Sequence, residues 1–273
     1  MIVWACIAPH SGELIPELAN GNLQRMATTR AALERLGRHC RAEQPETIVV
    51  YTPHGICVEG LISVSVSRYV SGHLDGEDGG RVSCRLPVDR EFAHTLAVQA
   101  AQARIPMVEA AYLPNGEPAA ELPLDWGSLV PLWFMGAQWE RPPSVVIVCP
   151  SRSLPRRQLV AFGRITAVAA EQSGKRIALI CSGDQGHGHS LRGPYGFSPY
   201  SRSYDLTYCR AIQQDDLRRL LHWRSDWVAS AMPDSFWQTL MLHGAVTYRG
   251  MRGTLLSYEA PTYFGMACAE FTT

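Results

Sequence analysis

The chain has 273 residues, enough for one large domain or two small ones with a substantial hydrophobic core. Its 25 basic and 25 acidic residues balance, and no run or stripe of Lys and Arg occurs, so nucleic acid is not an expected partner. The N-terminal apolar run is too short to span a bilayer and lacks the basic region and cleavage site of a signal peptide, so we expect no membrane association.

Four short apolar runs, rich in β-branched residues, predict strands that are buried on both faces of a sheet. These runs are residues 1–8, 47–52, 144–150 and 176–183. The segments between and after them have the spacing of amphipathic helices. These segments are residues 22–43, 89–104 with Asp89 as N-cap, 155–173 and 205–231. The alternation predicts an α/β fold with a central, mostly parallel sheet that is flanked by helices.

The remaining segments complete this picture. Alternating apolar and polar residues over 60–70 predict an additional exposed or edge strand, and residues 253–271 predict one or two strands around a break at Pro261. Segments 73–80 and 113–123 are rich in Gly, Asp, Glu or Pro and predict loops. No internal repeat or low-complexity linker occurs, so we expect a single domain over residues 1–273.

The eight cysteines favour a reducing compartment. None belongs to a C-x-x-C pair, and four lie inside apolar runs, at Cys6, Cys149, Cys181 and Cys268. Buried thiols of this kind are more typical of intracellular proteins than of disulfide frameworks or zinc fingers. We therefore expect a cytoplasmic protein.

Four of the nine histidines lie just past the C-terminal end of a predicted buried strand. His10 follows the first strand in "PHSGEL", and His54 follows the second in "TPHG". His187 and His189 follow the fourth strand in "SGDQGHGHS". Because ligands of open α/β sheets bind at the carboxyl ends of the strands, we expect these imidazoles to converge on one edge.

Acidic residues near the same edge could complete a metal site. Two histidines and one carboxylate on one face can bind Fe(II) and leave open positions for a substrate and O₂. The candidates are Glu13, Asp184, Asp234 and Glu259. Asp234 begins an apolar helix and could equally be its N-cap, and Glu259 could equally be a hydrogen-bonded structural carboxylate. Both alternatives stay open at this point.

The Pro- and Gly-rich segment 193–205, "GPYGFSPYSRSYD", carries several aromatic side chains, Tyr195 among them. It predicts either a lid or wall around a planar substrate or a loop packed by its own aromatic residues. No phosphate-binding loop or G-x-S-x-G nucleophile motif occurs.

Five motifs, taken together and in order, resemble the class III extradiol ring-cleavage dioxygenases, specifically the catalytic LigB-type subunit. They are "PHSGEL", "VVYTPHG", "LPLDWGSLVPLWFM", "ICSGDQGHGHSLRGPYGFSPYSRSYD" and "WQTLMLHGAV". The resemblance implies a single α/β domain and O₂-dependent opening of a catechol-type ring at non-haem Fe(II). The related Memo-like proteins share the scaffold without this activity.

By position, His10 and His54 resemble the two imidazole ligands, and His187 resembles the acid/base histidine of the family. An imidazole with a pKa near its ordinary value can accept and return a proton at neutral pH. Two positions depart from the family pattern. Trp126 replaces a histidine that contacts substrate or oxygen, and Ser235 stands where the family has its ligand Glu. Asp234 is therefore the preferred third ligand and Glu259 the alternative, while His189 is a candidate substitute for the missing imidazole.

These residues predict an Fe(II)-dependent extradiol-type dioxygenase that acts on a small catechol or aminophenol, with Mn or Zn as alternative metals. The expected site comprises His10, His54 and Asp234 for the metal, His187 and His189 for proton transfer, and Trp126 and Tyr195 for the substrate. Three alternatives remain: a non-catalytic Memo-like metal-binding protein, the inert partner subunit of a two-subunit dioxygenase, and a metal-dependent hydrolase. The resemblance also implies a homo-oligomer, with a second subunit as an alternative partner.

Overall fold

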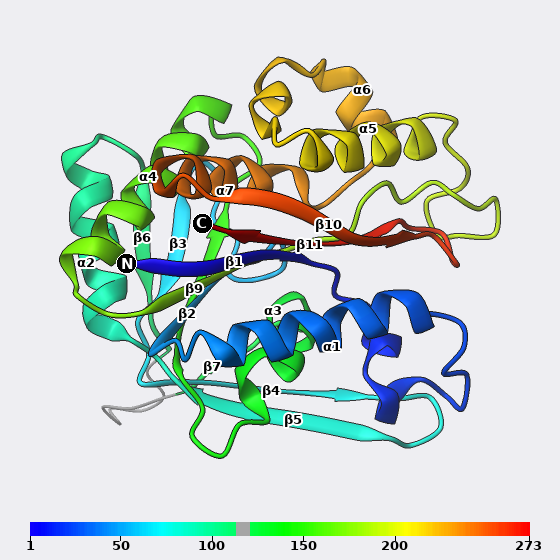
Figure 1. Cartoon of the computed structure of the whole chain (residues 1–273), viewed down its shortest axis with the longest axis horizontal. Coiled ribbons are helices and arrows are strands. Elements are labelled where there is room, and N and C mark those ends of the chain that lie inside the picture. The colour runs from blue at the N-terminus through cyan, green and yellow to red at the C-terminus, as the bar shows by residue number, and fades with distance from the viewer. Residues whose placement is uncertain (113–120) are drawn as a thin grey trace.

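The computed structural model describes residues 1–112 and 121–273, which form an eight-stranded sheet, a second sheet of three strands, and helices (Figure 1). In sheet order, the eight strands are β10 (Arg252–Glu259), β11 (Met266–Thr272), β1 (Ile2–Ala8), β9 (Ile177–Ser182), β2 (Thr47–Tyr51), β8 (Ser144–Pro150), β3 (Ile62–Ser65) and β6 (Met107–Ala110).

The centre of the sheet consists of four neighbouring parallel strands, β1, β9, β2 and β8. Every residue of β2 and β9 is buried, which explains their continuous apolar sequences. Outside this centre, β11 pairs antiparallel with β1, and β3 pairs antiparallel with β8. The carboxyl ends of the four central strands therefore meet at one edge of the sheet.

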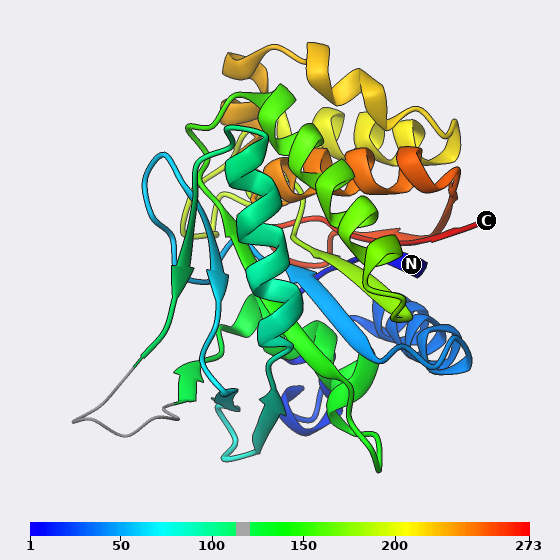
Figure 2. The ribbon, with the colours of Figure 1, turned by 90° about the vertical axis from the view of Figure 1, so that its left-hand side faces the viewer.

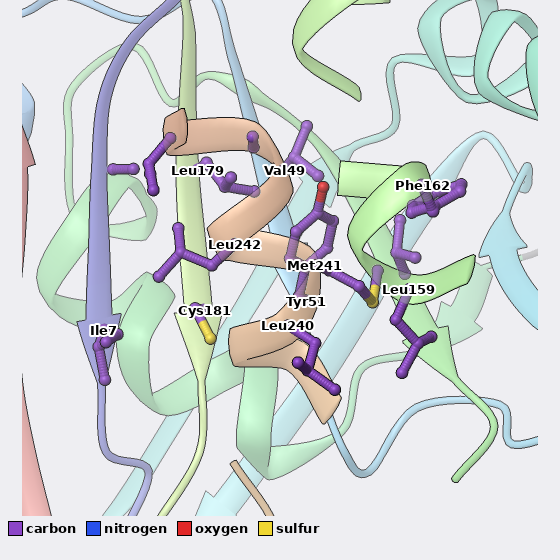
Figure 3. Close-up of a cluster of buried hydrophobic side chains, with 14 of the residues drawn as sticks. Ile7, Val49, Tyr51, Leu159, Phe162, Leu179, Cys181, Leu240, Met241 and Leu242 are labelled. Atoms are coloured by element: carbon purple, nitrogen blue, oxygen red, sulfur yellow. The ribbon is translucent and has the colours of Figure 1, made fainter. Parts of the chain in front are cut away.

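One face of the sheet packs against four helices: α2 (Arg90–Gln102), α4 (Arg156–Gln172), α5 (Ser201–Gln213) and α7 (Phe236–Arg249). Figure 2 shows α2 and α4 side by side over this face. The core here combines every second strand residue with side chains of α4 and α7 (Figure 3). The labelled residues are Ile7, Val49, Tyr51, Leu159, Phe162, Leu179, Cys181, Leu240, Met241 and Leu242.

The other face is covered by α1 (Ala27–Ala42), α3 (Trp126–Leu132) and the small sheet of β5 (Arg81–Pro87), β4 (Tyr69–Asp75) and β7 (Glu121–Pro123). The intervening strand residues point to this side, where Trp4, Cys6, Ile48, Val50 and Ile180 are all buried. The period of two along each strand thus divides the apolar residues between two cores.

The predicted α/β fold class, with a central sheet flanked by helices, is confirmed, and the four predicted buried strands correspond to β1, β2, β8 and β9. Asp89 caps α2 as predicted, because its carboxylate accepts a hydrogen bond from the Phe92 backbone N–H. The C-terminal segment forms two strands, β10 and β11, with Pro261 between them. The extent of the domain, residues 1–273, stays a prediction.

Other boundaries were predicted wrongly. Segment 60–70 contributes to two strands, β3 and β4, and β3 lies inside the main sheet between β8 and β6. Segment 205–231 forms α5, a 3₁₀ turn (Leu217–His222) and α6 (Ser225–Ala231), because Asp215 has a left-handed φ of 54° that ends the first helix. The loop predicted at 73–80 belongs to β4 up to Asp75.

The loop predicted at 113–123 is replaced by β7 from Glu121 onward, and its residues 113–120 lie outside the described part of the chain. None of the helices formed by residues 1–112 and 121–273 has the length and apolar character needed to cross a membrane.

Candidate metal centre

Three of the four parallel strands deliver side chains to one cluster at their carboxyl ends. His10 follows β1, His54 follows β2, and Asp184 and His187 follow β9. Asp234, just ahead of α7, completes the cluster. His10, Asp184 and Asp234 are buried, which is unusual for groups that can carry charge unless they are paired or bind metal.

The two imidazoles and Asp234 form a nearly equilateral triangle of ligand atoms. The His10 and His54 Nε2 atoms are 3.2 Å apart, and each lies 3.3 Å from Asp234 Oδ2. Two ligand atoms that each lie about 2.1 Å from an ion, at right angles to each other, are about 3.0 Å apart. The triangle therefore fits a divalent ion bound on one face, and its nitrogen and oxygen atoms suit iron or zinc.

The hydrogen bonds around His10 fix the tautomer that a metal ligand needs. Ser182 Oγ donates to the Gly127 carbonyl, so its oxygen is left to accept from His10 Nδ1–H at 3.1 Å. His10 Nε2 consequently faces the cluster, where its lone pair would be available to a metal ion that displaces its proton. Partners of this kind orient ligand imidazoles in metal sites and raise their basicity.

His187 is held in the same way but lies slightly outside the triangle. Its Nδ1 donates to the Met232 carbonyl at 2.8 Å, because a carbonyl can only accept. Its Nε2 points toward the cluster, 3.8 Å from Asp234 Oδ2. Tyr195 meets the His187 ring edge-on at 5.7 Å, and Phe264 stacks on it at 5.7 Å. The His187 ring is therefore held by one hydrogen bond and two aromatic contacts, with its Nε2 on the side of the cluster.

A second carboxylate, Asp184, supports the first. Its backbone N–H donates to Asp234 Oδ1 at 2.7 Å, which turns Asp234 Oδ2 toward the imidazoles. Its own carboxylate accepts from the His10 backbone N–H through Oδ1 and lies 3.4 Å from His10 Nε2 through Oδ2. Asp184 therefore holds both Asp234 and His10 in place.

The charges in the cluster act strongly on one another. Burial lowers the pKa of His10, but the carboxylates of Asp184 and Asp234 outweigh it and raise that pKa to about 9. Burial raises the pKa of Asp234, yet the neighbouring His10, His54 and His187 hold it well below its usual range. Burial and the charge of Asp234 raise the pKa of Asp184. A cation here would take the place of protons that the cluster otherwise holds.

The cluster lies in a cavity of about 710 Å³ whose lining also includes Trp126, Tyr195 and Arg152. Trp126 is the first residue of α3, which Asp125 caps by accepting from the Ser128 N–H. The Trp126 ring stacks on His54 with a centroid distance of 4.1 Å and an interplanar angle of 26°. Since its side chain is half exposed, Trp126 presents an aromatic surface next to the metal ligands.

The structure brings six of the seven sequence-predicted site residues, together with Asp184, to one cavity, and it shows where the carboxylates that were left open lie. The N-cap of α7 is Ser235, not Asp234. Glu259 accepts hydrogen bonds from the Thr29 N–H and hydroxyl at 2.7 and 2.5 Å, so it is a structural carboxylate away from the cluster. Glu13 lines the cavity but pairs with Arg25 at 3.2 Å.

Tyr195 and His189 belong to the same Gly-rich region but differ in position. Tyr195 lines the cavity, whereas His189 is not among the described residues that line it. The His189 Nε2 pairs with Asp205 Oδ2 at 2.7 Å, and the same carboxylate accepts from the Tyr258 hydroxyl. This places the His189 Nε2 in a hydrogen-bonded network outside the cavity, and a role for His189 in proton transfer stays a prediction.

Three residues of the site escaped the sequence reasoning. Ser182 and Met232 bind imidazole Nδ1 atoms, and Arg152 lines the cavity. Ser182 and Met232 carry no sequence signal, because one lies inside a strand and the other acts through its backbone. Arg152 had a usable signal, since it follows the strand β8 by two residues.

Comparisons with known proteins agree with this geometry. A family model described as the catalytic LigB subunit of aromatic ring-opening dioxygenase matches residues 5–268. Protein CA_C1420 of Clostridium acetobutylicum is 25% identical over 253 residues, which are 93% of this chain and 54% of that protein, so the chain spans about half the length of this relative.

Among solved structures, the crystal structure of the uncharacterized protein JW3007 from Escherichia coli K12 has the same fold. It superposes with a TM-score of 0.64 at 19% identity and covers 98% of this chain and 99% of that chain. Because the family model spans nearly the whole sequence, the chain belongs to the family of the catalytic LigB subunit of aromatic ring-opening dioxygenases.

Proposed function

We propose that this protein is a non-haem Fe(II)-dependent extradiol-type dioxygenase that opens the ring of a small catechol or aminophenol. In this proposal His10, His54 and Asp234 hold the iron, and His187 is the acid/base residue. The observation that carries the proposal is the triangle of two imidazole nitrogens and one carboxylate oxygen with a third imidazole, His187, beside it, all in one cavity. Membership of the family supports the same reaction.

When bound, the iron would hold the two ring oxygens of the substrate and O₂ together and allow electron density to pass between them. The chain supplies the remaining steps. The Nε2 of His187 accepts the proton of one ring hydroxyl, while its Nδ1–H remains bonded to the Met232 carbonyl. General-base assistance of this kind contributes roughly 10²–10⁴-fold to a rate. After ring opening, the same nitrogen returns the proton to the product.

Two aromatic residues bind the substrate ring in this scheme. Trp126 offers its face beside His54, and Tyr195 closes the side next to His187. Aromatic pairs favour offset stacking or edge-to-face contacts, which suit a flat ring between these two side chains.

The test is oxygen uptake by Fe(II)-reconstituted protein with a panel of catechols and aminophenols. We expect the wild type to consume O₂ and open the ring, His187→Ala to bind iron with strongly reduced turnover, and His222→Ala, at an exposed position, to behave as wild type. Full activity of His187→Ala, or a wild type that binds no divalent metal, would contradict the proposal.

A second candidate is a Memo-like metal-binding protein without ring cleavage, or an inert partner subunit. Trp126 favours it, because its ring covers one side of His54 where a catalytic imidazole is expected from the family pattern. Metal binding without oxygen uptake on any member of the panel, in wild type and in Trp126→His, is the result that this candidate predicts.

We further propose that the protein works in the cytoplasm, where its eight free thiols would stay reduced. A homo-oligomer is the proposed assembly, which size-exclusion chromatography with light scattering would test directly.

A further inference from the structure

Asp205 of α5 is a fully buried carboxylate that does not belong to the triangle of metal ligands. Its Oδ1 accepts a hydrogen bond from the Gly186 backbone N–H, and its Oδ2 accepts from His189 Nε2–H, both at 2.7 Å. The hydroxyl of Tyr258, on β10, donates to the same Oδ2 at 2.7 Å. A buried carboxylate is costly to a fold unless donors of this kind surround it. One side chain thus ties two segments that are distant in sequence to α5.

These bonds hold the chain on both sides of His187. Gly186 directly precedes this residue, and His189 follows it by two positions. The His187 backbone N–H donates to the Ala231 carbonyl at 3.1 Å, and its ring Nδ1–H donates to the Met232 carbonyl, both at the end of α6. The ring of His187 is therefore held between two helices, α5 and α6.

Asp205 also supports the aromatic side of the His187 ring. A Cβ atom at Gly265 would collide with Asp205 Oδ2, so the backbone of Gly265 packs directly against this carboxylate. The Gly265 N–H donates to the Gly186 carbonyl at 3.0 Å. Gly265 directly follows Phe264, which stacks on the His187 ring. A displaced Asp205 would therefore disturb both the backbone and an aromatic neighbour of His187.

The geometry of His189 differs from that of a residue that moves protons in the reaction. A general base must lie within hydrogen-bond reach of the proton that it accepts. His189 is not among the described residues that line the cavity, and its Nε2 is bonded to Asp205. Its effect on a reaction would pass through His187, because a misplacement of about 1 Å can cost a rate about 10²-fold.

We propose that Asp205 and His189 are positioning residues that hold the His187 ring with its Nε2 toward the metal centre. The inference rests on the proposed function for the role of His187 as the acid/base residue. The placement of the His187 ring can be measured without turnover, which makes the two parts separable by experiment.

The experiment changes the donor at His189 in two ways. His189→Leu removes it, whereas the amide of His189→Gln can still donate to Asp205 but cannot carry a proton. The matched control is His222→Leu, at an exposed position. NMR of Zn(II)-loaded protein with ¹⁵N-labelled histidine measures the exchange of the His187 ring N–H with water, and the loss of this signal in His187→Ala assigns it. Oxygen uptake by Fe(II)-loaded protein measures turnover.

We expect His189→Leu to exchange the His187 ring proton about tenfold faster than wild type or more, because a hydrogen bond to a charged group is lost. Its kcat should fall about tenfold or more, with KM and metal affinity little changed. His189→Gln should keep most of both properties, and His222→Leu should match wild type. Tyr258→Phe removes another donor from Asp205 but keeps the ring, and it should shift the exchange in the same direction by less.

Unchanged exchange of the His187 ring proton in His189→Leu would overturn the inference, and if that variant does not fold, unchanged exchange in Tyr258→Phe decides in the same way. A His189→Gln protein as impaired as His189→Leu would also overturn it, because the imidazole itself would then be needed. A wild type that opens no ring, but whose His187 exchange depends on the His189 donor, would support the inference and reject the proposed reaction instead.

Discussion

At the scale of single residues, the site depends on which nitrogen of each imidazole carries the proton. His10 and His187 each donate Nδ1–H to a fixed acceptor and so direct Nε2 into the cavity. The sequence could locate both histidines, because each follows a buried strand. It could not reveal the acceptors, since Ser182 is an ordinary strand residue and the Met232 acceptor is a backbone carbonyl.

The acceptor of His10 provides a prediction. Ser182→Ala removes the partner of His10 Nδ1–H and should let the ring choose the other tautomer or rotate. We expect the affinity for a divalent metal to fall about 10–100-fold, the usual effect of losing such a partner. Competition with a chromophoric chelator would measure it.

The matched control is Ser203→Ala, at an exposed position of α5. An unchanged metal affinity in Ser182→Ala would show that the Ser182 hydroxyl does not set the tautomer or ring orientation of His10.

At the scale of elements, the best-predicted segments are the strands that are buried on both faces of the sheet. The four central strands are continuous apolar runs and were found with nearly correct ends. Strands β4, β5 and β7 lie in the small sheet, where many side chains are exposed and the apolar signal is weak, so β5 and β7 were missed. Asp184 and Asp234 come together because the backbone N–H of Asp184, in the loop after β9, donates to the Asp234 carboxylate, just ahead of α7. Residue spacing within either segment could not predict this contact between two segments.

The crossing of α4 and α7 provides a second prediction. A Cβ atom at Gly163 would collide with the Met241 carbonyl oxygen, and one at Gly244 would collide with the Val160 carbonyl oxygen. Gly163→Ala should therefore separate the helices and cost about 1–3 kcal/mol of unfolding free energy, despite the better helix propensity of Ala.

Urea unfolding would measure this cost from the midpoint and slope. Arg164→Ala, at the next and exposed position of α4, should stay within about 0.5 kcal/mol of wild type. A Gly163→Ala protein as stable as wild type would contradict the close approach of the two helices.

The N-cap of α2 provides a prediction on pH. Burial raises the pKa of Asp89, but hydrogen bonds from Lys175, Thr47 and the Phe92 N–H outweigh it and lower that pKa below its usual value. Since the folded pKa is below the unfolded one, Asp89 stabilises the fold above the unfolded value of about 3.9. This contribution is lost as the pH falls from there through the folded pKa.

The urea midpoint of the wild type should therefore fall more steeply below about pH 5 than that of Asp89→Asn. The variant should be less stable near neutral pH and should approach the wild type in acid. Parallel profiles for the two proteins would show that Asp89 titrates alike in the folded and unfolded states.

At the scale of the whole molecule, the parallel arrangement of four strands explains why residues distant in sequence share one cavity. Each strand ends at the same edge, so each following loop adds a side chain there: His10, His54, His187 and Arg152. This rule allowed the histidines to be predicted from sequence. The same rule, applied to β8, would have pointed to Arg152.

The most direct test of the account is the fate of ¹⁸O₂ with Fe(II)-loaded protein and a panel of catechols and aminophenols. We predict that the wild type converts the substrate to a ring-opened product that carries two labelled oxygen atoms, and that Asp234→Ala neither retains iron nor forms this product. An iron-loaded wild type that leaves every catechol and aminophenol intact, or an Asp234→Ala variant with full iron content and turnover, would contradict it.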